Sequence, residues 1–208
     1  MPYAEHVKAN FFQPFYVERI EIAHKATDIE GKKFDLAFLK FWCSVIDFYG
    51  GIYWVFKKNA IQTRNGKTTL STGASFAEFI TDFFPPPDNN YGNFIYSVFR
   101  SGIVHQLAPK RSEIHWSHST ISDLVWIKLD TSKTNQHDNK VANINLKKFR
   151  EFTYQAFIKF LQKVNDPTND ANCENVYRHL INFADIFEDG KNLNDAYNRI
   201  TGSPIRVI

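Results

Sequence analysis

The sequence predicts a mainly α-helical protein, a bundle of four to six helices with a small β-hairpin or three-stranded insertion around residues 112–145. Three observations predict this fold class. In several segments apolar residues recur at steps of three and four, the period of an amphipathic helix. Near residue 112 the pattern changes to short β-rich runs, and it becomes helical again after Asn145. A chain of 208 residues that is 43% apolar suits one core, so we expect residues 1–208 to form a single domain with a C-terminal tail at 189–208.

The first half of the chain predicts helices of increasing regularity. Residues 5–28 carry a helical repeat in which Pro14 predicts a kink or a break. The segment 34–56 is apolar almost all round, so we expect this helix at the centre of the core. Its Gly50-Gly51 pair lowers helix propensity, which favours a close crossing with another helix. The polar residues 59–73 predict a loop.

The next elements are predicted from capping residues and prolines. Ser75, with Glu78 three residues later, is typical of a capping box and predicts the start of a short helix that ends at the prolines 85–87. Asn89 or Asn90 is then expected to cap a helix that Pro109 closes.

The second half begins with strands. Ile114 and Trp116, with the later run 124–129, predict a two-stranded hairpin, to which residues 141–144 add a third strand. Asn145 is expected to cap the following helix, and a last helical repeat covers residues 173–188.

Composition excludes several functional classes. The net charge of +3 is too small to require a nucleic-acid or membrane partner by bulk charge. Cys43 and Cys173 lack the spacing of a disulfide framework or a zinc site and are expected to be buried. The chain has no apolar leader or membrane span, which favours a cytoplasmic protein. It also lacks a Gly-rich phosphate loop and the common hydrolase and metalloprotease motifs, so we expect no cofactor and no metal.

One short motif carries a functional prediction. Arg100, Ser101 and His105 lie in a stretch otherwise built for burial, with four residues between the arginine and the histidine. This pattern resembles the active-site motif of the HEPN family, all-helical domains that include metal-independent RNases. The resemblance implies a homodimeric endoribonuclease that leaves a 2′,3′-cyclic phosphate and acts as a toxin or in phage defence. It equally permits a non-catalytic interaction module, the partner of a nucleotidyltransferase or of a defence complex.

The chemistry of the two side chains fits RNA cleavage. A histidine titrates near neutral pH, so His105 is a candidate base or acid for the ribose 2′-OH. A guanidinium holds two phosphoryl oxygens with paired hydrogen bonds, so Arg100 is a candidate clamp, and Ser101 a supporting residue. On an ideal helix a five-residue step turns the side chains about 140° apart. The dimer that the resemblance implies brings two copies of the motif together.

Competing interpretations accompany each of these residues. Arg19 with His24, and Arg111 with His118, have comparable spacings, but a polar residue follows only Arg100 among the candidates within helices. A structural interpretation pairs Arg100 with a carboxylate on a neighbouring helix and His105 with a backbone carbonyl.

Further residues are candidates for RNA contacts or for a metal. Lys110, Arg111 and Trp116, with Trp126 nearby, are candidates for binding single-stranded RNA, although core packing also explains the tryptophans. His115 and His118 suggest a metal only weakly, because no third ligand is evident.

Overall fold

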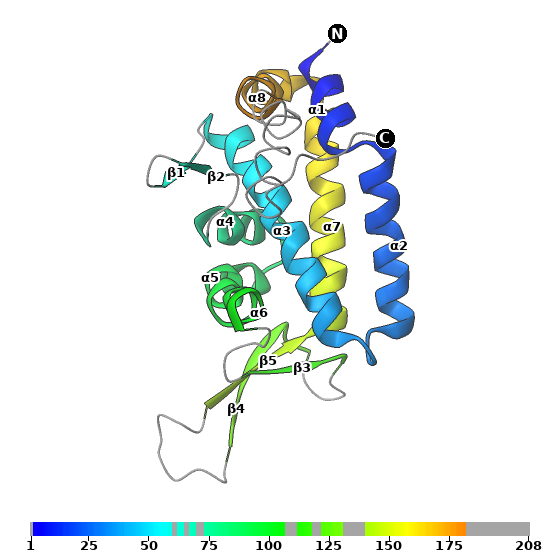
Figure 1. Ribbon diagram of the computed structural model, residues 1–208, viewed down its shortest axis with the longest axis vertical. Helices are drawn as coiled ribbons and strands as arrows, with labels where there is room; N and C mark the ends of the chain where they lie inside the picture. The colour runs from blue at the N-terminus through cyan, green and yellow to red at the C-terminus, as the bar shows by residue number, and fades with distance from the viewer. Residues whose placement is uncertain are drawn as a thin grey trace, which may run out of the picture.

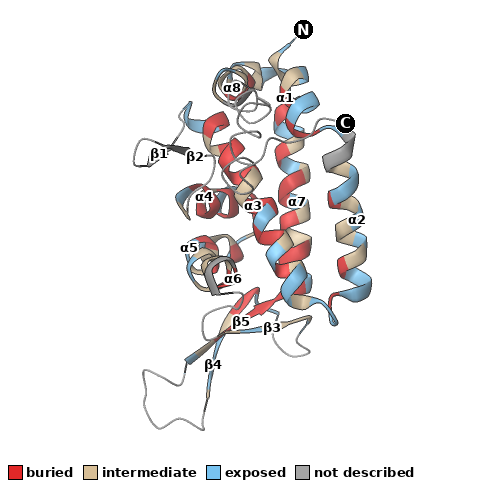
Figure 2. Cartoon of the chain, viewed as in Figure 1, coloured by how far each residue is buried: buried red, intermediate tan, exposed pale blue. Residues whose placement is uncertain are grey.

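Helix α3 (Asp35–Lys58) lies at the centre of the computed structural model, with α4 (Gly73–Phe83) on one side and α7 (Leu146–Asn165) on the other (Figure 1). Helix α2 (Pro14–Glu30) packs on α7 and leaves its outer face exposed (Figure 2). The structure describes residues 2–59, 62–64, 67–69, 73–106, 112–117, 122–130 and 140–181. The predicted fold class, a helical bundle with a small strand insertion, is confirmed. The predicted tail at 189–208 lies outside the described residues.

The structure confirms two predictions about the helices, the break at Pro14 and the close helix crossing at Gly50. The helix is interrupted before Pro14, since α1 (Tyr3–Phe11) ends at Phe11 and α2 begins at Pro14. A proline is tolerated as the first residue of a helix because the backbone N–H at that position has no partner within the helix. Gly50 lies at the crossing of α3 and α4. A Cβ there would approach the Ser75 carbonyl oxygen to 3.0 Å, so a side chain at this position would press the backbone of α4 away by a few tenths of an ångström.

The predicted capping box at the start of α4 is wrong. The helix begins at Gly73, and Ser75 is buried inside it. Glu78 does not reach back to the helix start; its carboxylate binds Lys57 at 2.9 Å and Lys58 at 2.7 Å on α3. Tertiary ion pairs therefore outweigh the local capping pattern. Residues 59–73, predicted as a loop, include a short antiparallel hairpin of β1 (Gln62–Arg64) and β2 (Lys67–Thr69).

The insertion forms one mixed three-stranded sheet with an unexpected strand order. The order is β3 (Ser112–His115), β5 (Lys140–Asn145) and β4 (Val125–Leu129). The hairpin therefore joins β4 to β5 antiparallel, while β3 joins β5 in parallel, and the predicted pairing of the first two strands is wrong. Burial explains the order, because four consecutive residues of β5, from Ala142 to Asn145, are buried and so suit the central strand.

The second half of the bundle is fixed by α7. Asn145 caps this helix as predicted, since its side-chain oxygen accepts a hydrogen bond from the Lys148 amide at 3.0 Å. The chain continues through η3 (Pro167–Asn169), α8 (Asp170–Val176) and the π-helical turn η4 (Tyr177–Ile181). Within the described ranges no helix is long and apolar enough to cross a membrane.

Candidate active site

The predicted motif lies on a helical segment that changes its hydrogen-bonding pattern three times. It begins with the 3₁₀ turn η1 (Asp88–Tyr91), continues as α5 (Gly92–Ile95) and the π-helical turn η2 (Tyr96–Arg100), and ends as α6 (Ser101–Gln106). Arg100 is the last residue of the π-turn. The sequence predicted a regular helix with an asparagine cap, but no side chain caps α5. Single π-turns within helices occur often at functional sites.

Arg100 is held by a carboxylate from the central helix. Its Nε donates to Oδ2 of Asp47 on α3 at 2.7 Å, and the side chains are 21% and 18% exposed. The guanidinium carbon also lies 5.1 Å from the centre of the Tyr96 ring, one turn earlier. Burial lowers the pKa of Arg100, but the hydrogen bond and charge of Asp47 outweigh burial and raise this pKa above its usual value.

The Asp47 contact uses one edge of the guanidinium. Among the described residues Asp47 is the hydrogen-bond partner of Arg100, and only Nε takes part in this bond. The two terminal nitrogens of Arg100 make no hydrogen bond to another described residue. In arginines that bind phosphate, these nitrogens take part in the fork-like contact with the oxygens. The structure therefore confirms the prediction that Arg100 pairs with a carboxylate on a neighbouring helix. The pair uses Nε and leaves the terminal nitrogens of Arg100 available to bind an anion.

Cys43 lies beneath this ion pair, one helical turn before Asp47, and is buried. Burial, reinforced by the Asp47 charge, raises the pKa of its thiol well above the usual value. The thiol is therefore protonated at neutral pH and is a packing group, not a nucleophile.

The remaining motif residues are only partly described. Ser101 is half-buried, opens α6 and donates its amide to the Tyr96 carbonyl. The backbone of His105 lies in the last turn of α6, but its side chain lies outside the described residues, as do Lys110 and Arg111. The roles predicted for His105, Lys110 and Arg111 stay predictions.

Trp116 has a packing role in the structure. It follows β3 and is half-buried against Gly31, at the end of α2, where a Cβ would lie 2.0 Å from a ring carbon. Its carbonyl accepts the Lys147 amide at the start of α7 at 3.0 Å. Trp116 thus joins α2 to α7, as the core-packing alternative proposed, and its role in RNA binding stays a prediction.

The competing pair Arg19 and His24 lies on α2. His24 Nε2 is 3.0 Å from Oε2 of Glu151 on α7, and its ring stacks on Tyr154 with the centroids 4.2 Å apart. The neighbouring Arg150 is buried and bridges to Asp28 at 2.9 Å. These contacts connect α2 to α7, so His24 has a structural task, which the sequence alone did not reveal. The other competing histidine, His118, lies outside the described residues.

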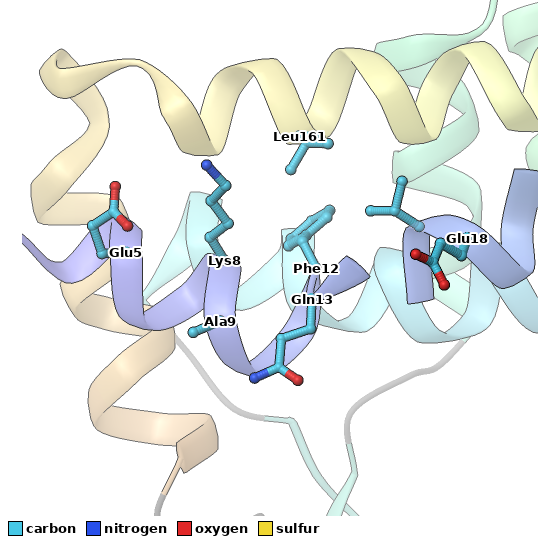
Figure 3. Close-up of a pocket in the computed structure, with 8 residues that line it drawn as sticks. Glu5, Lys8, Ala9, Phe12, Gln13, Glu18 and Leu161 are labelled. Carbon is cyan, nitrogen blue, oxygen red and sulfur yellow. The ribbon is translucent and has the colours of Figure 1, made fainter. Parts of the chain in front are cut away.

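A cavity of about 540 Å³ lies elsewhere, between α1, α2 and α7 (Figure 3). Its apolar lining includes Phe12, Val17 and Leu161, and the charged residues Lys8 and Glu18 also line it. Of the motif residues with described side chains, neither Arg100 nor Ser101 lines it. In the part of the chain that the structure describes, no three metal-binding side chains cluster.

Comparisons with protein-family models, with curated proteins and with solved structures gave no match. Function must therefore be inferred from the residues themselves, and above all from the surroundings of Arg100.

Proposed function

We propose that this protein is a metal-independent endoribonuclease of HEPN type, with Arg100 and His105 as its catalytic groups. The observation that carries the proposal is the state of Arg100, which a carboxylate fixes through Nε while its terminal nitrogens have no partner among the described residues. An arginine positioned in this way loses little freedom when it binds a phosphate group.

The reaction uses the two groups in complementary roles. His105 takes the proton of the ribose 2′-OH as that oxygen attacks the adjacent phosphorus. The bond from phosphorus to the 5′-oxygen breaks, and the imidazolium of His105 in a second copy of the chain protonates the leaving oxygen. The products are a 2′,3′-cyclic phosphate and a 5′-OH end. Arg100 stabilises the charge that grows on the phosphoryl oxygens.

Cleavage of mixed RNAs in the presence of EDTA tests the proposal. We expect the purified protein to cleave and both Arg100→Ala and His105→Ala to lose at least about 100-fold in rate, as with the loss of one transition-state donor. Equal cleavage by all three proteins would assign the activity to another site or to a contaminant. Light scattering must also show a dimer, because the resemblance implies that two copies of the motif share one phosphate.

The second candidate function is a non-catalytic interaction module. The pairing of Arg100 with Asp47 and the packing of Trp116 on Gly31 favour it, because both give predicted site residues a structural task. A folded dimer without any RNA cleavage, in which Arg100→Ala lowers only stability, would support this alternative.

A further inference from the structure

An aromatic pocket lies on the same helical segment as Arg100. It has a volume of about 260 Å³ and is lined by Tyr91, Phe94, Val125, Trp126 and Ile127. Tyr91 ends η1 and Phe94 lies in α5, whereas the other three residues begin β4. Figure 1 shows α5 and α6 directly beside this sheet. Phe94 precedes Arg100 by six residues, which is about 9 Å along a helix axis.

Buried polar contacts fix the walls of this pocket. Asp88, which opens η1, is buried and accepts a hydrogen bond from the Leu124 amide at 3.2 Å, directly before β4. The other oxygen of Asp88 binds Lys148 Nζ at 2.6 Å. Asp88 therefore ties the helical wall to the chain directly before the strand wall.

The strand wall leaves apolar surface uncovered. Ile127 is 51% exposed and Leu129 is 57% exposed, although both lie on the face of β4 that carries the buried Val125. A row of this kind on an edge strand is a feature that proteins normally cover.

A free positive charge lies next to this apolar surface. Lys140 on β5 is the cross-strand partner of Leu129, so its side chain shares the face of Ile127 and lies about 7 Å further along the strand. Lys140 is exposed and has no ion-pair partner in the described residues. Lys128 is also exposed, but it lies on the opposite face.

We infer that this pocket holds one unstacked base of single-stranded RNA, with the neighbouring phosphate on Lys140. The aromatic residues Tyr91 and Phe94 of the helical wall and the apolar strand wall suit the face of a base, and the lysine complements the charge of the backbone. The pocket is smaller than the usual site for a drug-sized ligand. The inference rests on the proposed function and adds to it a subsite that selects single strands, because a paired base is not free to enter.

Binding of a short, fluorescein-labelled RNA with 2′-O-methyl groups tests this subsite without cleavage, since the attacking hydroxyl is blocked. We expect Phe94→Leu, which keeps most of the side-chain volume, and Lys140→Ala each to weaken binding by about tenfold or more. The matched controls Phe34→Ala and Lys128→Ala, an exposed aromatic and a lysine on the other face of β4, should stay within about twofold. Duplex RNA should bind more weakly than the single strand.

Three outcomes would overturn the inference: no binding by the wild-type protein, equal binding by all variants, or loss of a dimer in light scattering with Phe94→Leu, which would make the pocket a subunit interface. The proposed function fails separately. Arg100→Ala should bind the blocked RNA but not cleave a normal one. Cleavage that depends on Arg100, with binding insensitive to Phe94 and Lys140, would refute only the subsite.

Discussion

Replacing Asp47 with asparagine tests whether this carboxylate positions Arg100. The substitution keeps the shape of the side chain and removes its charge. A hydrogen bond to a charged group contributes about 1.5–3 kcal/mol to stability. The side chains of Asp47 and Arg100 are about one-fifth exposed. Because solvent screening weakens partly exposed pairs, we expect Asp47→Asn to lose about 1–2 kcal/mol. In a protein of this size that loss lowers the melting temperature by about 4 °C.

The same substitution should slow RNA cleavage more than its effect on stability explains. An Arg100 side chain without its carboxylate samples other rotamers, and a misplacement of about 1 Å costs about 100-fold in rate. Calorimetry and single-turnover cleavage of a labelled RNA measure the two effects. Glu18→Gln, at an exposed position of α2, is the control and should change neither.

A charge swap separates positioning from simple pairing. The double variant Asp47→Arg, Arg100→Asp restores an ion pair between α3 and the motif but moves the guanidinium to α3. We expect it to recover part of the lost stability and none of the lost cleavage. The reasoning is refuted if Asp47→Asn melts and cleaves like the wild-type protein, or if the swapped variant cleaves RNA.

Three further substitution experiments test how the fold holds the motif. Gly92→Ala should lower the free energy of unfolding, measured by urea denaturation, by about 1–3 kcal/mol, because a Cβ there would lie 2.7 Å from the Ala77 backbone. An unchanged urea midpoint would mean that the motif segment does not pack on α4 in this way. Asp88→Ala should cost about 2–3 kcal/mol, since it removes the buried acceptor of both the Lys148 ammonium and the Leu124 amide. Removing the lysine charge as well with Lys148→Met should recover part of the loss. Burial raises the pKa values of Glu78 and Asp82, but bonds to lysines outweigh burial and lower both. The stabilisation by these two carboxylates is therefore present above their unfolded pKa values and is lost as the pH falls below about 4. The double variant Glu78→Gln, Asp82→Asn should lose less stability than the wild-type protein as the pH is lowered through this range. An acid dependence equal to that of the wild type would contradict these shifts.

The elements that sequence predicted best are those whose pattern is set by the core. The helix around 34–56 and the helix after Asn145 each carry apolar residues at helical spacing that must be buried in the core. The cap at Asn145 is a local contact between residues three apart in the chain, so sequence alone predicts it. Gly50 was informative for the same reason, because a glycine inside a buried helix needs a close neighbour.

The errors arose where distant partners compete with local patterns. Glu78 is placed as in a capping box, but two lysines on α3 offer stronger bonds than a backbone amide. The strand order depends on which strand is buried on both faces, and the short runs around 112 and 125 do not reveal that the later β5 enters between them. The π-turn before Ser101 leaves no mark in the spacing of apolar residues.

The partnership of Arg100 and Asp47 was within reach of the sequence and shows how such a site is recognised. Asp47 is the charge that interrupts the apolar run 45–56, and Arg100 is the charge that interrupts the apolar helix predicted before Pro109. A charge placed among apolar neighbours is costly unless another charge compensates it. Two opposite charges, each isolated in its own apolar helix, therefore predict each other, and the 2.7 Å contact is the result. Whether Arg100 can also bind an anion depends on which of its nitrogens the Asp47 carboxylate leaves unused. The geometry of the π-turn decides this, and the spacing of residues in the sequence does not reveal it.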